Sequence, residues 1–121
     1  MRALIVEPGK KPYVGELSDL KAMQKCVGGH IQAVYPWKDA KAALVCDEEG
    51  LFHDSCWNRF ICEGLAIKGT FFICGLGEED FEDLPDDLIH RFEKEFHDPH
   101  VFVKTPRGML VLDVHGTRAS I

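Results

Sequence analysis

The sequence predicts an α+β domain, in which a mostly antiparallel sheet of about six short strands packs with two main helices. Three observations support this class. Short apolar or alternating segments recur between turn residues, only two main segments show helical periodicity, and the two kinds do not alternate as a doubly wound nucleotide fold requires. With 121 residues, 45% of them hydrophobic, the chain is long enough for a core of its own. We therefore expect a single domain over residues 1–121.

Four of the predicted strands lie in the first half of the chain. Residues 3–6 form a continuous apolar run, which is typical of a buried strand. Leu51 and Phe52 are expected to continue as a hairpin arm after the fourth strand, whereas residues 53–68 show no clear pattern. The four strands are expected at residues 3–6, 13–17, 30–35 and 42–46.

One main helix is expected over residues 19–27. Apolar residues at positions i, i+3 and i+7 from Leu20 lie on one helical face. Ser18 is expected to cap its start, and Gly28 is expected to end it because glycine adopts the left-handed conformation easily.

The second main helix is expected over residues 85–97, with Pro85 as its first helical residue. A buried strand at 70–74 and a short helix at 78–84 are expected before it, and a C-terminal hairpin over 100–114 after it. The apolar face of the second helix consists of Leu88, Ile89, Phe92 and Phe96.

Charge is unevenly distributed along the chain, whose net charge is −6. Residues 78–98 contain ten acids and two bases, a net of −8, so that the remainder carries +2. An acidic region repels the nucleic-acid backbone, so direct nucleic-acid binding is not expected, and it favours basic protein partners. No apolar run approaches the ~20 residues that span a bilayer. We expect a protein of the bacterial host cytosol that does not bind membranes.

Metal ligation and disulfide bonding are not expected. The five cysteines are odd in number and include no Cys-x-x-Cys, which argues for buried apolar cysteines such as Cys46 and Cys74. His97 and His100 are separated by Asp-Pro, and this spacing does not match a helical ligand pair. We expect no metal and no other cofactor.

Catalytic motifs are also missing from the sequence. Gly75-Leu-Gly77 follows a strand, but three carboxylates come next where a phosphate loop needs free amides and a lysine. No serine lies in a Gly-x-Ser-x-Gly context. The sequence therefore favours a binding protein over an enzyme.

Aromatic residues next to basic ones suggest where a ligand would bind. Stacking on an aromatic ring contributes ~1–3 kcal/mol per base, and arginine holds phosphate through two hydrogen bonds. In the stretch CWNRF, the alternative is a structural one, in which Trp57 and Phe60 are core and Arg59 pairs with a carboxylate such as Asp54 or Glu63. The candidate ligand-binding residues are Tyr35, Trp37, Lys38, Trp57, Asn58 and Arg59.

Several segments together resemble a family of small proteins of uncharacterised function carried by phages, conjugative elements and gut Firmicutes. The segments are ALIVEPGKKPY at 3–13, VGGHIQAVYP at 27–36, ALVCDEEG at 43–50, the Asn58-Arg59 pair, and GTFFICGLGEEDFEDL at 69–84. The resemblance spans about residues 2–97, and the residues that flank Asn58-Arg59 depart from the family pattern.

The resemblance implies a setting for the protein rather than a chemistry. It suggests a small, non-enzymatic binding protein that counters host defence by sequestering a nucleotide-type immune signal, as a homo-oligomer. One alternative is an inhibitor that binds a host defence protein through the acidic face at 78–98. Another alternative is a phosphoesterase-like enzyme acting on the same ligands.

Overall fold

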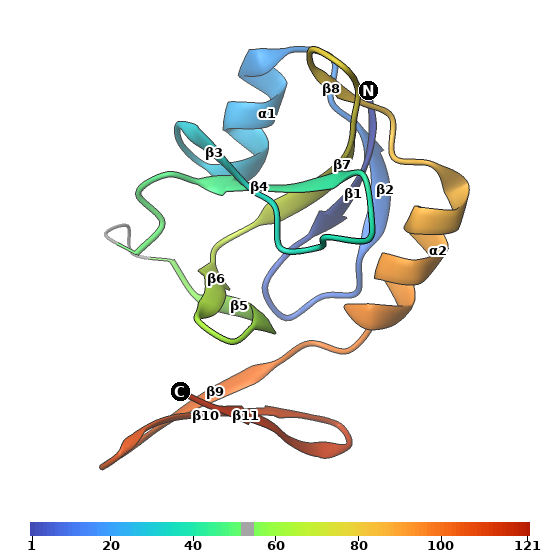
Figure 1. The fold of residues 1–121 in the computed structure, drawn as a ribbon. Coiled ribbons are helices and arrows are strands. Elements are labelled where there is room, and N and C mark those ends of the chain that lie inside the picture. The colour runs from blue at the N-terminus through green and yellow to red at the C-terminus, as the bar shows by residue number, and fades with distance from the viewer. Residues whose placement is uncertain (52–54) are drawn as a thin grey trace.

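The computed structural model describes residues 1–51 and 55–121, and these form eleven strands and two helices (Figure 1). The α+β class is confirmed. The main sheet has six strands, all antiparallel, in the order β2-β1-β7-β4-β3, with the short β8 paired to β7. Its strands are β1 (Arg2–Val6), β2 (Tyr13–Glu16), β3 (Ile31–Val34), β4 (Ala42–Asp47), β7 (Phe71–Leu76) and β8 (Phe81–Glu82).

The two faces of the main sheet are both covered. Helix α1 (Leu20–Val27) packs on one face, over Ile5, Val45 and Phe72. Helix α2 (Asp86–Glu95) and the hairpin β5–β6 pack on the opposite face. Double coverage explains why the central strands are continuous apolar runs rather than alternating ones.

The helix boundaries differ slightly from those expected. Asp19 caps α1, because its side chain accepts a hydrogen bond from the Ala22 N–H at 2.8 Å, so the cap expected at Ser18 is wrong by one residue. Gly28 ends α1 with a φ of 87°, as predicted. Pro85 lies at the N-cap of α2 with extended backbone rather than at its first helical position.

The short helix expected at residues 78–84 is wrong. The chain turns back instead, and β8 pairs with the end of β7 through Leu76 opposite Phe81. The Gly77 N–H donates to the Asp80 carbonyl at 2.8 Å, which closes the turn. Phe81 also packs with the apolar cluster under α1, and this burial favours a strand in a segment with no helical apolar periodicity.

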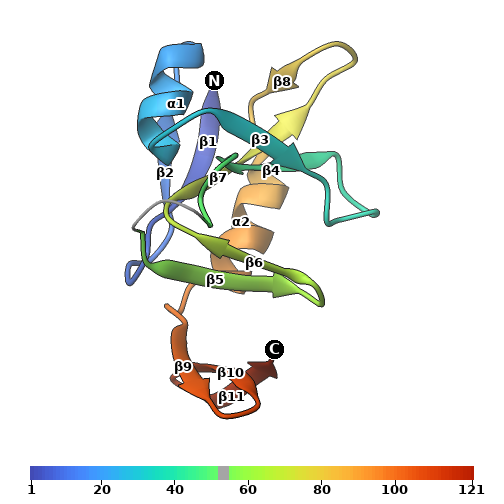
Figure 2. The same cartoon turned by 90° about the vertical axis from the view of Figure 1, so that its left-hand side faces the viewer.

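Part of the segment without a clear pattern forms a hairpin of its own, β5 (Trp57–Cys62) and β6 (Leu65–Lys68). Figure 2 shows this hairpin between the main sheet and the C-terminal strands. Leu51 lies in a turn, and Phe52, the other half of the expected hairpin arm, lies outside the described residues.

The five cysteines differ in burial, and Cys26 is half-buried. Cys46 and Cys74 are buried in β4 and β7, as predicted. Cys56 and Cys62 are exposed, so the expectation of buried cysteines is wrong for these two. Both flank the buried centre of β5, where the chain leaves the core.

The expected C-terminal hairpin is part of a three-stranded sheet, β9 (Val101–Thr105), β10 (Gly108–Asp113) and β11 (Gly116–Ser120). This sheet lies against β5, where the rings of Trp57 and Phe102 stack at 5.3 Å between centroids. Val111 is fully buried, so the C-terminal strands have a packed inner face. None of the helices in the described part of the chain has the length and apolar character to cross a membrane.

Candidate functional site

Asn58 and Arg59 are fully buried in β5. The Asn58 Nδ2 donates to the Val6 carbonyl at 2.8 Å and to the Gly69 carbonyl at 2.9 Å, and its Oδ1 accepts from Arg59 Nη1 at 2.8 Å. Asn58 thus joins the hairpin β5–β6 to the end of β1 and to the start of β7.

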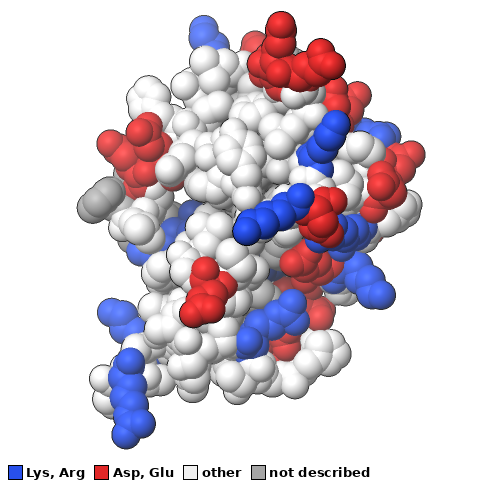
Figure 3. All heavy atoms as spheres, viewed as in Figure 1, with Lys and Arg blue, Asp and Glu red and all other residues white. Residues whose placement is uncertain are grey.

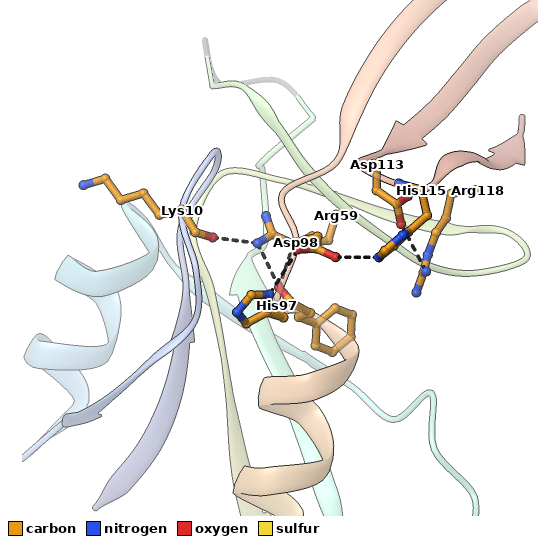
Figure 4. A network of polar contacts seen from close by, with 8 residues as sticks. Lys10, Arg59, His97, Asp98, Asp113, His115 and Arg118 are labelled. Atoms are coloured by element: carbon orange, nitrogen blue, oxygen red, sulfur yellow. Dashed lines mark hydrogen bonds and ion pairs between the residues drawn. The ribbon is translucent and has the colours of Figure 1, made fainter.

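Arg59 joins β5 to two further segments, the β1–β2 connection and the end of α2. Its Nη2 donates to the Lys10 carbonyl at 2.6 Å and to the Phe96 carbonyl at 3.0 Å, and its Nε donates to the same Phe96 oxygen at 3.3 Å (Figure 4). Burial lowers the pKa of Arg59 to about 10, an effect that the charge of Asp98 opposes, so the side chain stays protonated at neutral pH. Its positive charge is also attracted by the partial negative charge that the helix dipole places at the C-terminal end of α2.

Arg59 is therefore a buried structural residue, as one of the two interpretations of CWNRF expected. Its hydrogen-bond partners, however, differ from the carboxylates that were expected. Among the described residues, its hydrogen bonds go to carbonyl oxygens and to the Asn58 amide, not to a carboxylate. Glu63 is exposed in the turn after β5, and Asp54 lies outside the described residues. Neither Asn58 nor Arg59 is accessible to a ligand in this arrangement.

The other four predicted ligand-binding residues lie apart from one another. Trp57 stacks on Phe102, with Lys68 Nζ 5.3 Å from its ring centroid. Trp37 packs on α2, 4.2 Å from the Phe92 ring centroid. Tyr35 and Lys38 are exposed. The six residues do not converge on one cavity.

A different group of side chains does converge, in a cavity of about 380 Å³ between α2 and the C-terminal sheet. Sequence reasoning missed this group, because its members are spread over 28 positions and come from three elements and two connections. Its lining consists of Arg91, Lys94, Glu95, Asp98, His100, Asp113, His115 and Arg118.

Ion pairs fix several of these side chains. Arg118 Nη1 lies 3.2 Å from Asp113 Oδ2, and Asp98 lies between His97 Nδ1 at 3.0 Å and His115 Nε2 at 3.5 Å (Figure 4). The His115 N–H and the charge of Arg118 hold the pKa of the Asp113 carboxyl below its usual value.

The α2 wall of the cavity carries a second set of charges. Arg91 makes a bidentate pair with Asp39, at 2.9 and 3.2 Å. Glu95 is half-buried, and this burial raises the pKa of its carboxyl. Lys94 is exposed and forms no ion pair within the described residues. It is therefore the lining cation most available to an anionic ligand.

His100 is the most buried residue of this lining, with 7% of its surface exposed. Its Nδ1 accepts a hydrogen bond from the Phe60 N–H at 3.0 Å. Burial and the nearby charges of Arg59 and Arg118 lower the pKa of His100 to about 4, so the ring is neutral at neutral pH.

Taken together, the lining offers three cations and three carboxylates around one hollow. Cations bind phosphate oxygens, and carboxylates accept hydrogen bonds from hydroxyl groups. The arrangement suits a small ligand that carries both kinds of group.

Comparison with known proteins gives one match. Residues 1–97 match the model of a family described as a domain of unknown function, DUF3846. No curated protein and no solved structure matches the chain. The expected resemblance to an uncharacterised family is confirmed, and its matched part ends just before the C-terminal side of the cavity begins.

Proposed function

We propose that this chain, which belongs to the DUF3846 family of domains of unknown function, is a small non-enzymatic binding protein that captures a nucleotide-type ligand. The observation that carries the proposal is the cavity between α2 and the C-terminal sheet. Its volume, about 380 Å³, falls in the range of small-molecule sites, roughly 300–1,000 Å³.

The charges of the cavity support a ligand that combines phosphate and sugar. Lys94 and Arg118 are placed to bind phosphate oxygens, where hydrogen bonds between charged groups are about twice as strong as neutral ones. The carboxylate of Glu95 lines the same cavity and would accept hydrogen bonds from ribose hydroxyls. A nucleotide carries both groups within one molecule.

The test is to incubate the purified protein with a panel of cyclic and linear nucleotides, and then to heat-denature it and analyse the released ligand. We expect one or more members to bind and to be recovered intact. Binding to no member of the panel would overturn the proposal, and conversion of a bound member to product would identify an enzyme instead.

A matched pair of variants locates the site. Lys94→Ala removes the lysine of the cavity, and we expect binding about tenfold weaker, the loss of one charge-assisted hydrogen bond. Lys104→Ala removes the same charge from the exposed strand β9, outside the lining, and should leave affinity unchanged. Equal effects of the two substitutions would place the ligand elsewhere.

The wider setting is also part of the proposal. A protein of phage or mobile-element origin that sequesters a nucleotide immune signal, as a homo-oligomer, should restore phage plating in bacteria that carry a nucleotide-signalling defence. The support for this setting is the family resemblance described above. If plating stays unchanged while ligand binding is intact, the anti-defence role is wrong and the binding function stands.

The alternative inhibitor would use the acidic residues of 78–98. They lie in the turn between β7 and β8, in β8, in helix α2 and in the connections on either side of α2, and Figure 3 shows acidic groups separated by basic ones on the face in view. Reversal of Glu78, Glu79, Asp86 and Asp87 should abolish capture of a host protein by such an inhibitor. Under our proposal the same reversal leaves nucleotide binding intact, because none of the four lines the cavity.

A further inference from the structure

We infer that His100 donates its Nε2–H to a phosphate oxygen of the bound ligand, and so acts as the inner binding residue of the cavity. The inference rests on the proposed function. It adds to it the residue that contacts the phosphate, the atom that makes the contact, and the requirement for a phosphate group.

The Phe60 N–H determines which ring nitrogen carries the proton. A backbone N–H donates only to a nitrogen without a hydrogen, so the 3.0 Å contact requires an unprotonated Nδ1. In a neutral imidazole the single proton is then on Nε2. The backbone of β5 therefore holds His100 in the tautomer whose donor, Nε2–H, is directed away from β5.

The other ring nitrogen of His100, Nε2, is not engaged by the part of the protein that the structure describes. Among the described residues, none accepts a hydrogen bond from it. Within the described residues, Arg2 Nε is buried without a hydrogen-bond partner, and His100 Nε2 is not. Because Nε2 also has no partner among those residues, it is in contact with solvent. His100 lines the cavity and is otherwise buried, so we infer that Nε2 contacts solvent within the cavity.

The surroundings of His100 favour an anionic acceptor over a neutral one. Burial, the guanidinium of Arg59 and the charge of Arg118 lower the pKa of His100. The carboxylates of Asp113 and Asp98 oppose them with smaller effects. The positive charges of Arg59 and Arg118 attract an anion, while the neutral ring supplies a donor without adding a third charge.

A phosphate fits this donor set better than a carboxylate does. Lys94 comes from α2, Arg118 from β11, and His100 from the connection between α2 and β9, so the three donors come from different segments around the cavity. A tetrahedral phosphate presents oxygens in several directions, whereas the two oxygens of a carboxylate lie in one plane.

Two variants of His100 distinguish the role of Nδ1 from the role of Nε2. In His100→Asn, the amide oxygen takes the place of Nδ1 and keeps an acceptor for the Phe60 N–H, but the side chain is too short to reach the Nε2 position. In His100→Gln, the amide nitrogen reaches the Nε2 position, but the acceptor for Phe60 is lost. The first variant therefore removes the proposed contact, and the second removes the structural hydrogen bond.

The probes are adenosine 5′-monophosphate and adenosine, with affinity measured by titration calorimetry. We expect the wild-type chain to bind the monophosphate more tightly than adenosine. His100→Asn should bind the monophosphate about tenfold more weakly, with adenosine binding unchanged, and His100→Gln should keep most of the monophosphate affinity despite a lower melting temperature. Wild-type affinity for the monophosphate in His100→Asn would overturn the inference.

A measurement on the wild-type chain removes any dependence on variant folding. In a ¹⁵N spectrum of the histidine rings, addition of the monophosphate should shift the Nε2–H signal of His100 and leave its Nδ1 unprotonated. An unchanged Nε2–H signal, or no binding of the monophosphate, overturns the inference. The proposed function falls only if the whole nucleotide panel fails to bind, so the two failures are distinguishable.

Discussion

The guanidinium of Arg59 is held in the core by oxygens that carry no formal charge. Its partners are the carbonyls of Lys10, Asn58 and Phe96 and the Asn58 side chain, which come from the β1–β2 connection, β5 and the end of α2. Removal of Arg59 leaves these acceptors unpaired in a region from which water is excluded. The residue therefore stabilises the contact between three segments.

Substitution of Arg59 should accordingly act on stability. We expect Arg59→Ala to lower the free energy of unfolding by at least ~3 kcal/mol, because buried acceptors lose their donor and a cavity is left. Urea denaturation followed by tryptophan fluorescence measures this change. Lys68→Ala, at a half-buried position on the neighbouring strand β6, is the control and should cost ~1 kcal/mol or less. Similar losses for the two variants would contradict the structural role.

His100 makes stability depend on pH in a predictable direction. Its pKa falls from 6.5 to about 4 on folding, so below pH 6.5 the unfolded chain binds a proton that the folded chain does not. The contribution of the neutral His100 ring to the free energy of unfolding is complete above pH 6.5. It is lost as the pH falls toward 4, by at most ~3 kcal/mol.

Comparison with a variant isolates this titration from others. His100→Asn should show a flatter decline of the free energy of unfolding between pH 6.5 and 4, measured by urea denaturation at each pH. The lowered pKa of Asp39 acts equally in both chains, whereas His100 is itself among the causes that lower the pKa of Asp113, so part of the difference between the curves comes from that carboxyl. Parallel curves for the two chains would show that His100 titrates normally.

At the scale of elements, two glycines test two different constraints. A Cβ on Gly75 would overlap the Asp83 carbonyl oxygen, so Gly75→Ala forces β7 and the segment after β8 apart. Gly64 has a φ of 82° but open space around it, so Gly64→Ala meets conformational strain alone.

We expect Gly64→Ala to cost ~1 kcal/mol and Gly75→Ala ~2 kcal/mol or more, with the larger loss in the main sheet. Thermal unfolding by circular dichroism ranks the two variants. A larger loss for Gly64→Ala would mean that β8 adjusts to the added methyl group, and that close packing at Gly75 is not a constraint.

The same elements show what periodicity predicts and where it fails. The continuous apolar runs of β1, β4 and β7 predict buried strands because both faces of the sheet are covered. β5 escapes the pattern because Asn58-Arg59 interrupts its apolar residues, although both are buried. β11, with the sequence GTRAS, has no apolar pattern, because its strand conformation depends on pairing with β10.

The candidate site was less predictable than the fold. The sequence draws attention to aromatic residues next to basic ones, but Trp37 and Trp57 are used in packing. The charges that do converge come from α2 and from residues after 97, and only the third C-terminal strand brings Arg118 to Asp113. The spacing of these charged residues in the sequence does not indicate that they lie close together in the fold.

At the scale of the whole molecule, the C-terminal sheet is attached by few contacts. The stacked pair Trp57–Phe102 and the hydrogen bond from Phe60 to His100 join it to β5. We expect Phe102→Ala to increase amide exchange in β9, β10 and β11 while the main sheet keeps its protection, because local stability follows local contacts.

Hydrogen exchange read by mass spectrometry tests this expectation. Val101→Ala, at an exposed neighbour on β9, is the control and should leave exchange unchanged. Because the sheet forms one side of the cavity, Phe102→Ala should also weaken nucleotide binding. Uniform loss of protection across the chain would show instead that the two sheets unfold as one unit.

The position of the cavity also has an evolutionary consequence. Three lining residues lie within the family-matched segment 1–97 and five lie beyond it. Under the proposed function, the family-matched segment provides part of the recognition surface and residues 98–121 provide the rest. Exchange of residues 98–121 would then change the ligand without rebuilding the main sheet, so we expect selection for new ligands to act on them first.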